Sequence, residues 1–392
     1  MGVTDVVLTP PISKSDAQRA LVLARIIGAP DPLPDEELPA DVQVLRAGLD
    51  ALATGGAEIQ CHDGGAPFRF LLTQAAVTPG AHVKLFGTPR LAERPHSALF
   101  DALQPAAQRG AGTLLAEVRA LEPLPESFTV SSDQSSQFAS SLLLGAAAIA
   151  HRTQRPCTVR VEGARVSDGY LQMTVRWLRA AGFEVRGDSA LVVKWVAPRA
   201  LPELPGDWSS LGYLLLAAWS CDGRVARLSD PTLHPDGAIV AALSSVGLTV
   251  HDDGRVIGAL LGHLDVSARR FPDSIPTLAA LACVLPEPSR FCDCAILRGK
   301  ESDRVEGISA LARAAGATVQ LSGDTLTLTP PARVAALQLD SRDDHRLAMA
   351  AGTLAAIAHV PLKLRGGECV KKSFPGFWRE LALTGTRPEL LG

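Results

Sequence analysis

The sequence predicts an α/β protein of two domains. Its 392 residues exceed what one ordinary hydrophobic core holds. A pattern of an apolar helical stretch, a glycine and a short β-prone run recurs along the chain. Hydrophobic residues make up 47% and charged residues 20%, a balance typical of compact folded proteins. Together these observations predict six α/β units, three in each domain.

The recurring glycine is the basis of the six units. A glycine that follows a helix adopts the left-handed conformation at little cost and turns the chain towards the next strand. Helix-glycine-strand junctions also arise by chance in α/β proteins, but the near-even spacing favours a repeat. The clearest copies end at Gly56, Gly182, Gly247 and Gly316, and weaker copies end at Gly110 and Gly385.

The first element is a short buried strand at residues 6–8, which Pro10 and Pro11 stop. A helix over residues 16–24 follows, so Lys14 lies at a strand-to-helix turn. Hydroxyl, ammonium and guanidinium groups converge there with the free N–H groups of a helix start, an arrangement that suits a phosphorylated ligand. The alternative is an ordinary serine N-cap with solvated charges.

Two proline-rich stretches punctuate the chain. Residues 30–39 are acidic and rich in proline, and we expect a surface loop there because the repeat continues across them. Prolines at 198, 202 and 205 interrupt regular structure near the middle of the chain. This second stretch predicts a domain boundary.

Three polar clusters of the first half precede expected helices or turns. Residues 63–69 form a glycine-containing loop before a helix at 70–77, and glycines let a ligand approach the backbone. Residues 89–95 hold two arginines between prolines, which would preorganise an anion clamp. Residues 131–137 carry more hydroxyl and amide groups than capping of a helix at 138–149 requires, which indicates a polyhydroxylated ligand.

The second half repeats this design. Asp273 precedes a helix at 277–284, residues 297–304 pack five charges into a turn, residues 343–346 precede a helix at 347–358, and residues 371–375 add two lysines. Solvated surface charge explains each cluster alone, but not their shared placement at helix entrances. Asp and His together could suggest a metal site, but Arg346 beside them would repel a cation.

Composition excludes several classes of protein. The net charge of −3 argues against wholesale binding of nucleic acid. No apolar run reaches the length of a membrane span, and we expect no cleaved leader and a cytoplasmic location. We expect the seven cysteines to be buried free thiols of a reducing compartment, with Cys292 and Cys294 on one face of a strand without the spacing of a zinc site.

The ordered motifs resemble those of the 5-enolpyruvylshikimate-3-phosphate (EPSP) synthase family over nearly the whole chain. They are Ser13-Lys14-Ser15 with Arg19, Glu93-Arg94-Pro95, Ser135-Ser136-Gln137-Phe138, Lys300 to Arg304, Asp344-His345-Arg346 and Lys372-Ser373-Phe374-Pro375. The resemblance implies the two-domain enolpyruvyl transferase fold, an inside-out α/β barrel-like architecture of six βαβαββ units. It implies one discontinuous domain of residues 1–14 and 206–392, an inserted domain of residues 15–205, and an active site in the interdomain cleft.

The reaction that the resemblance implies is enolpyruvyl transfer from phosphoenolpyruvate to the 5-hydroxyl of shikimate 3-phosphate, with release of phosphate. It implies catalytic roles for Lys14, Asp273 and Glu301. It implies that shikimate 3-phosphate contacts Ser15, Arg19, Ser135, Ser136, Gln137, Ser167, Tyr170 and Lys300. It implies that phosphoenolpyruvate contacts Lys14, Gly65, Arg94, Gln137, Arg304, Arg346 and Lys372. No metal or organic cofactor is needed, no nucleic acid or membrane is involved, and the chain is expected to be a monomer.

The glycine loop departs from the family pattern. Where the family reads Gly-Asn-Ala-Gly-Thr, this chain has His62-Asp63-Gly64-Gly65-Ala66, and Pro67 then removes an N–H from the helix start. We therefore expect altered phosphoenolpyruvate affinity and weakened inhibition by glyphosate, which shares that pocket in the family. Three alternatives remain: the sister enolpyruvyl transferase that acts on UDP-N-acetylglucosamine, a paralogue with another hydroxylated acceptor, and a non-catalytic anion-binding homologue.

Overall fold

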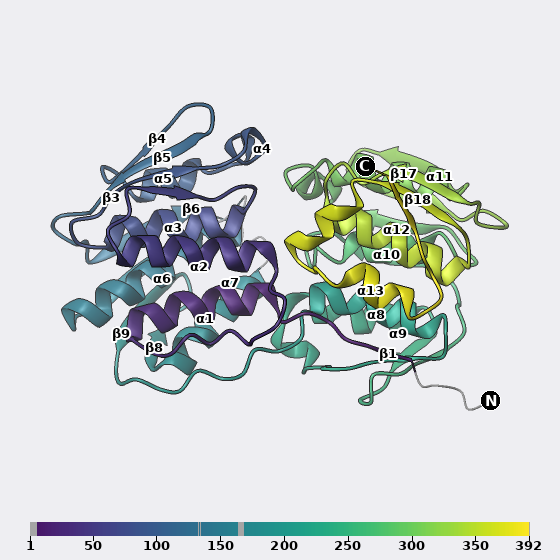
Figure 1. Cartoon of the computed structure of the whole chain (residues 1–392), viewed down its shortest axis with the longest axis horizontal. Coiled ribbons are helices and arrows are strands. Elements are labelled where there is room, and N and C mark those ends of the chain that lie inside the picture. The colour runs from purple at the N-terminus through teal and green to yellow at the C-terminus, as the bar shows by residue number, and fades with distance from the viewer. Residues whose placement is uncertain (1–5, 132, 134, 164–167, 392) are drawn as a thin grey trace. The chain divides into compact units, whose positions relative to one another are not determined.

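The computed structural model describes residues 6–131, 133, 135–163 and 168–391 (Figure 1). The chain divides into two compact units. Unit 1 consists of Met1–Ser13, Glu37–Pro39 and Pro205–Gly392, and unit 2 consists of Lys14–Glu36 and Ala40–Leu204. Both units combine helices with β-sheets, as the predicted α/β class requires.

Unit 2 has a core of packed helices. Its helices are α1 (Lys14–Ile27), α2 (Ala40–Ala53), α3 (Gly65–Val77), α4 (Pro89–Glu93), α5 (Ser97–Ala102), α6 (Ser136–Thr153) and α7 (Asp168–Ala181). Helix α6 packs against α1, α3 and α7 and is buried along nearly its whole length. A helix that is apolar all round, as the sequence of α6 is, requires this central position.

Two four-stranded sheets complete unit 2. Their strands are β2 (Glu58–Gln60), β3 (His82–Phe86), β4 (Ala107–Arg109), β5 (Leu114–Arg119), β6 (Ser127–Ser131), β7 (Cys157–Glu162), β8 (Phe183–Arg186) and β9 (Ala190–Trp195). The strand orders are β2-β3-β5-β4 and β6-β7-β9-β8, and in each sheet only the first pair is parallel. Buried and exposed residues alternate along β3 and β9, so one face of each sheet covers the helices.

Unit 1 repeats this architecture around α8 (Trp208–Trp219), α10 (Ile275–Ala282) and α12 (His345–Ala358), which pack together in its core (Figure 1). Its other helices are α9 (Ile239–Ser245), α11 (Arg304–Ala314), α13 (Phe377–Ala382) and the 3-10 helices η1 (Pro231–Leu233), η2 (Pro235–Ala238), η3 (Cys294–Leu297) and η4 (Gly367–Lys372). Buried apolar side chains of these elements form one continuous core.

The sheets of unit 1 differ in size. Strands β13 (Asp265–Ser267), β14 (Ser289–Cys292), β15 (Thr318–Ser322) and β16 (Thr325–Thr329) pair in the order β13-β14-β16-β15, as in unit 2. Strands β17 (Leu337–Asp340), β18 (Leu362–Arg365) and β19 (Glu389–Leu391) form a parallel sheet. Two pairs remain: β1 (Val7–Leu8) with β10 (Arg224–Val225), and β11 (Leu248–Val250) with β12 (Val256–Gly258).

The glycine prediction is confirmed at four of its six positions. Gly182, Gly247, Gly316 and Gly385 follow helices and have positive φ angles of 106°, 86°, 89° and 86°. It is wrong at Gly56, because Gly55 takes the left-handed position one residue earlier, with φ 75°. It is also wrong at Gly110, which lies in the turn between β4 and β5, where a side chain would meet the Leu114 carbonyl.

The other local predictions fare unevenly. The expected helices at 16–24, 70–77, 138–149, 277–284 and 347–358 correspond to α1, α3, α6, α10 and α12, and residues 30–39 form a loop. The seven cysteines are free, and four of them are buried. The placement of Cys292 and Cys294 on one strand is wrong. Strand β14 ends at Cys292, and the left-handed Asp293, with φ 56°, turns the chain into η3.

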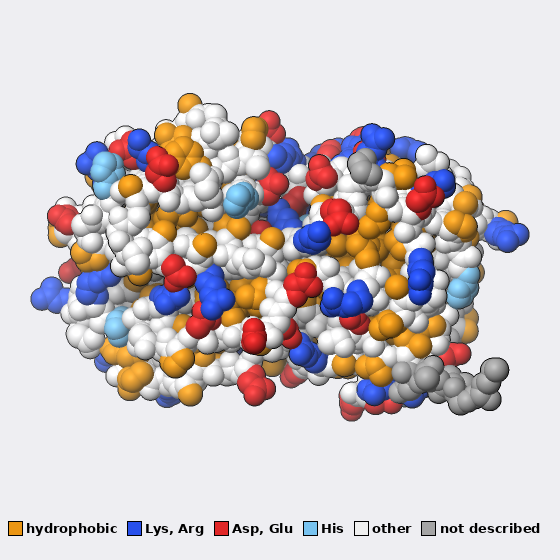
Figure 2. Space-filling model, in the orientation of Figure 1, with side chains coloured by type: hydrophobic (Ala, Val, Ile, Leu, Met, Phe, Trp, Pro, Cys, Tyr) orange, Lys and Arg blue, Asp and Glu red, His pale blue; other side chains and the backbone are white. Residues whose placement is uncertain are grey.

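The surface carries charges of both signs. On the face seen in Figure 2, Lys and Arg side chains are interspersed with Asp and Glu. This mixture agrees with the small net charge of −3. Among the described residues, no helix is long and apolar enough to span a membrane.

Candidate active site

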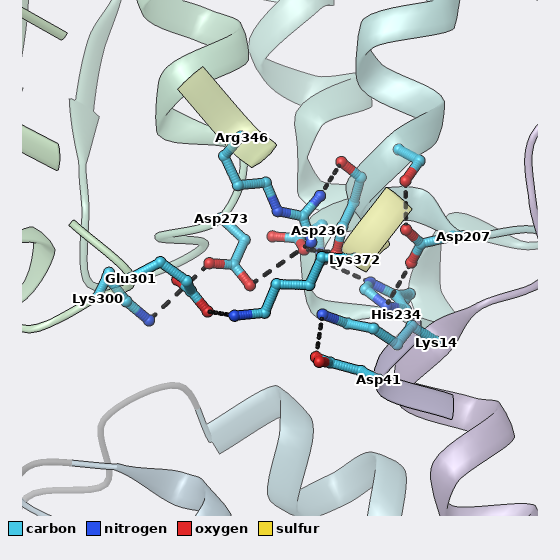
Figure 3. A network of polar contacts seen from close by, with 12 residues as sticks. Lys14, Asp41, Asp207, His234, Asp236, Asp273, Lys300, Glu301, Arg346 and Lys372 are labelled. Carbon is cyan, nitrogen blue, oxygen red and sulfur yellow. Dashed lines mark hydrogen bonds and ion pairs between the residues drawn. The ribbon is translucent and has the colours of Figure 1, made fainter. Parts of the chain in front are cut away.

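The charged residues singled out in the second half of the sequence meet in unit 1 at the starts of its helices. Asp273 precedes α10, Arg304 begins α11, and Arg346 is the second residue of α12. Side chains of Asp303 and Asp344 cap α11 and α12 by accepting hydrogen bonds from backbone N–H groups. Six charged side chains therefore lie together at these helix starts and at the end of η4: Asp273, Lys300, Glu301, Arg304, Arg346 and Lys372. Figure 3 labels Asp273, Lys300, Glu301, Arg346 and Lys372.

Arg304 is the centre of this cluster. Its side chain is 1% exposed, and it donates to three carboxylates. Nη1 lies 2.7 Å from Oδ1 of Asp273, Nη2 lies 2.8 Å from Oε2 of Glu301, and Nε lies 2.9 Å from Oδ2 of Asp344. Burial lowers the pKa of Arg304, but the three carboxylates outweigh this effect and raise the pKa well above its usual value. Arg304 is thus permanently charged and holds the carboxylates in fixed positions.

Asp273 faces three cations. Besides Arg304, Nζ of Lys300 lies 3.9 Å from its Oδ1 and Nη2 of Arg346 lies 3.9 Å from its Oδ2 (Figure 3). Burial raises the pKa of Asp273, but Lys300, Arg304 and Arg346 together hold it well below its usual range. The carboxyl is therefore ionised at neutral pH, and the side chain of Asp273 is 25% exposed.

Glu301 and Lys372 form another pair of oppositely charged side chains in the cluster. Nζ of Lys372 lies 3.8 Å from Oε1 of Glu301, while Oε2 of Glu301 accepts from Arg304. Both side chains are about one-sixth exposed, at 17% and 15%. A carboxylate and an ammonium at this spacing can exchange protons with a bound molecule.

In unit 2, Lys14 is the first residue of α1, and its ammonium lies 3.0 Å from Oδ2 of Asp41 in the first turn of α2 (Figure 3). The two side chains are 15% and 9% exposed. An ion pair this sheltered holds the flexible lysine in one direction.

Arg19 lies deeper in unit 2. Its guanidinium donates to the Ser15 carbonyl at 2.7 Å, to the Tyr170 carbonyl at 3.2 Å, and to hydroxyls of Ser140 and Thr174. It also lies over the ring of Phe70, 5.6 Å from the ring centroid. Burial lowers its pKa to about 10, so Arg19 still carries its charge at neutral pH. These hydrogen bonds join three of the predicted residues, Ser15, Arg19 and Tyr170.

The start of α6 gathers a second group in unit 2. Ser135 is the N-cap and accepts from the Gln137 N–H at 3.2 Å, and Ser136 is the first helical residue. Gln137 Oε1 accepts a short hydrogen bond from Nη1 of Arg69, which also donates from Nη2 to the Pro95 carbonyl at 3.1 Å. Arg69 is 2% exposed and ties Gln137 to the loop that carries Arg94.

The glycine loop packs directly on Arg94. A Cβ placed on Gly65 would lie 2.5 Å from Nη1 of Arg94, so a side chain at this position would displace the Arg94 guanidinium. Gly65, Ala66 and Pro67 are the first three residues of α3, and the N-cap Gly64 makes no side-chain cap hydrogen bond. Backbone N–H groups of a helix start and a guanidinium are thereby placed side by side, which is an anion-binding arrangement.

Three residues that are important to this geometry were not predicted as site residues: Asp41, Arg69 and Asp344. Asp344 and Arg69 lay within recognised motifs, and an aspartate before a predicted helix signals a cap. Nothing in the sequence indicates their second partners, which lie 40 and 68 positions away. Ser167 lies outside the described residues. Within the described part of the chain, no group of three or more His, Cys, Asp or Glu side chains could hold a metal ion.

The comparisons with known proteins all find the same protein family. A family model described as EPSP synthase (3-phosphoshikimate 1-carboxyvinyltransferase) matches residues 34–381. The 3-phosphoshikimate 1-carboxyvinyltransferase of Methanosphaerula palustris is 32% identical, with 98% of each chain covered, and that of Methanoculleus marisnigri is 30% identical, with 97% of each covered. A solved structure of EPSP synthase from Acinetobacter baumannii has a TM-score of 0.70 at 18% identity, covering 98% of this chain and 97% of the other. This structural likeness confirms the predicted fold.

Proposed function

Because the chain belongs to the EPSP synthase (3-phosphoshikimate 1-carboxyvinyltransferase) family, we propose that it transfers the enolpyruvyl group of phosphoenolpyruvate to the 5-hydroxyl of shikimate 3-phosphate. The family prediction made from the motifs is confirmed by the match over residues 34–381. The reaction places the protein in the shikimate pathway, which leads to chorismate and the aromatic amino acids.

The observation that carries this proposal is the carboxylate cluster organised by Arg304. Addition of the 5-hydroxyl to phosphoenolpyruvate requires a base at the hydroxyl and an acid at the methylene carbon, and elimination of phosphate reverses the proton transfer at carbon. Asp273 takes the hydroxyl proton, and Glu301 with Lys14 moves protons at the methylene carbon and the departing phosphate. An anion-binding protein without catalysis has no use for ionised carboxylates beside bound anions.

Two groups of residues bind the two anionic substrates. Phosphoenolpyruvate is held by Lys14, Gly65, Arg94, Gln137, Arg304, Arg346 and Lys372. Shikimate 3-phosphate is held by Ser15, Arg19, Ser135, Ser136, Gln137, Ser167, Tyr170 and Lys300. The α6 start, with its hydroxyls and N–H groups, suits the phosphate, and the guanidinium of Arg19 suits the carboxylate.

Unit 2 carries four of the seven proposed phosphoenolpyruvate contacts and unit 1 carries the other three, while all proposed shikimate 3-phosphate contacts except Lys300 belong to unit 2. Since one chain carries residues for both substrates and for proton transfer, we propose that the active protein is a monomer. Both substrates are phosphorylated metabolites of the cell interior, which favours a cytoplasmic location.

The test is phosphate release from phosphoenolpyruvate with and without shikimate 3-phosphate. We expect release only when both substrates are present. Binding of both without release would favour the non-catalytic homologue, and release with a different cyclic hydroxy acid but not with shikimate 3-phosphate would favour the paralogue. Release with UDP-N-acetylglucosamine would favour the sister transferase.

The glycine loop yields a separate prediction for Pro67→Ala. The third residue of α3 then gains an N–H at a helix start, where the first N–H groups lack intrahelical partners. One added hydrogen bond to an anion should lower the KM for phosphoenolpyruvate and the glyphosate inhibition constant about tenfold. The KM for shikimate 3-phosphate serves as the internal control and should stay within twofold. A wild-type glyphosate inhibition constant as low as that of sensitive family members would contradict the proposed effect of the loop.

A further inference from the structure

A buried polar cluster lies behind Arg346 in unit 1. It consists of Ser209, the second residue of α8, of His234, the N-cap of η2, and of Asp236, the second residue of η2. Ser209, His234 and Asp236 are 3%, 5% and 0% exposed. None of these residues belongs to the proposed substrate contacts, so the position of an ionisable carboxyl at full burial requires another explanation.

The cluster and Arg346 form one chain of hydrogen bonds (Figure 3). Nη1 of Arg346 donates to the Ser209 carbonyl at 2.6 Å. The Ser209 hydroxyl donates a short hydrogen bond to Oδ2 of Asp236. The Asp236 N–H donates to Nδ1 of His234 at 3.1 Å, which fixes the turn on which Asp236 stands. The hydrogen bonds thus connect the start of η2, through Ser209, to one edge of the Arg346 guanidinium.

The rest of Arg346 is held by different groups. Its backbone N–H donates to Asp344 at 2.9 Å, and its carbonyl accepts from the Tyr213 hydroxyl at 3.2 Å. Those contacts fix the backbone, whereas the direction of the guanidinium depends on Ser209. Nη2 lies 3.9 Å from Asp273, and the buried Nε has no hydrogen-bond partner within the described part of the chain. Among the described residues, the Ser209 carbonyl is therefore the acceptor that is hydrogen-bonded to this guanidinium.

Charge complementarity favours the same arrangement. Arg346 is buried, which lowers its pKa, but Asp273, Tyr213, Asp207 and Asp236 outweigh burial and raise it above its usual value. Asp236 therefore interacts favourably with the guanidinium without touching the substrate side. A buried carboxylate behind an arginine keeps the arginine in place when an anion arrives at its other side.

We propose that Asp236 is a positioning residue for phosphoenolpyruvate binding, and that it acts through the hydroxyl and carbonyl of Ser209 to direct the Arg346 guanidinium towards the anion. This inference rests on the proposed function, because it takes the anion to be phosphoenolpyruvate. It assigns to residues outside the recognised motifs a role in the affinity for one substrate only.

The test compares Ser209→Ala, Asp236→Asn and the double variant. Each single change should raise the KM for phosphoenolpyruvate about tenfold, as expected for a misdirected charged hydrogen-bond donor. The KM for shikimate 3-phosphate should stay within twofold. Both residues belong to the same series of hydrogen bonds, so the KM of the double variant for phosphoenolpyruvate should not exceed that of the more affected single variant. A merely structural role would reduce the active fraction, and hence kcat, without this selective change in KM.

Ser309→Ala is the matched control. Ser309 lies in α11 of the same unit, is 7% exposed and donates to the Val305 carbonyl at 2.7 Å, so its hydroxyl is bonded neither to Arg346 nor to a carboxylate. We expect its KM for phosphoenolpyruvate to equal that of the wild type. Equal effects of Ser309→Ala and Ser209→Ala, additive effects in the double variant, or a parallel rise in both KM values would overturn the proposal.

The proposal can still be tested if a variant does not fold or if the wild type releases no phosphate. If Asp236→Asn does not fold, the KM values of Ser209→Ala alone test the proposal. This variant keeps the Asp236 carboxyl and removes only the Ser209 hydroxyl that donates to it. Should the wild type release no phosphate, the proposed function has failed. The inference is then decided by calorimetric titration of phosphoenolpyruvate in the presence of shikimate 3-phosphate, in which unchanged affinity of Ser209→Ala overturns it.

Discussion

Asp273→Asn should lower kcat about 1,000-fold, which is the scale of losing a positioned general base. The substitution preserves the shape of the side chain and one acceptor oxygen for Nη1 of Arg304, 2.7 Å away. It replaces the carboxylate, which can take a proton from the 5-hydroxyl, by a carboxamide, which cannot. Both substrates should still bind, with dissociation constants within tenfold of the wild type.

The low pKa of Asp273 is consistent with this role. In the free protein, Lys300, Arg304 and Arg346 keep the carboxyl ionised despite its burial. A carboxylate held this strongly is a weak base, but all three of these cations are proposed substrate contacts. An anion bound to Lys300 or Arg346 offsets their charge, so the pKa of Asp273 should rise towards the range useful for proton transfer when the substrates bind.

The measurement is phosphate release under saturating substrates, with binding followed by calorimetry. Asp265→Asn is the control, because this carboxylate lies on β13 of the same unit, is 56% exposed and only approaches Arg290, at 3.7 Å. It should leave kcat unchanged. A kcat of Asp273→Asn within fivefold of the wild type would exclude Asp273 as the base.

Structural features that depend only on neighbouring residues could be predicted from the sequence, whereas features that depend on distant residues could not. Helices such as α6 and α12 were predictable because apolar runs and caps are local properties of ten to fifteen residues. Gly110 shows the limit of the same reasoning, because glycine also serves hairpin turns and nothing local distinguishes the two uses. The charged motifs indicated helix entrances for the same local reason.

The pairing of the charges was not predictable. The family resemblance implies that Arg304 contacts the substrate, but in the structure three nitrogens of its guanidinium donate to Asp273, Glu301 and Asp344. Asp344 caps α12 and serves Arg304 at the same time, and only the tertiary packing of α11 with α12 reveals the second task. The assignment of Arg304 to phosphoenolpyruvate therefore stays a prediction, to which the structure adds a role in holding the carboxylates.

That added role makes Arg304→Met the strongest test of stability. The variant keeps a long side chain but leaves three carboxylates facing one another in and around a buried site. Removing one partner from a buried ion pair typically costs about 3–5 kcal/mol of unfolding free energy. We expect a loss of this size in unit 1 at pH 7, measured by urea denaturation with unfolding followed by tryptophan fluorescence.

Its pH dependence should be opposite to that of the wild type. In the wild type, the folded state holds the pKa of Asp273 below its unfolded value, so this stabilisation is complete above about pH 4 and is lost as the pH falls further. In Arg304→Met, one of the cations is gone while burial remains, so a proton taken up by the cluster relieves repulsion. The unfolding free energy of the variant should therefore rise as the pH is lowered from 7 to 5, while that of the wild type does not.

Arg298→Met separates this effect from the loss of any arginine. Arg298 lies in the same turn and pairs with Asp303 at 2.6 Å, but its side chain is 45% exposed, so its pair is screened by water. We expect Arg298→Met to cost less than about 1 kcal/mol and to leave the pH dependence unchanged. If Arg304→Met were as stable as Arg298→Met at pH 7, the carboxylates would not depend on Arg304 for their charge. The cluster would then owe its geometry to the helix caps alone.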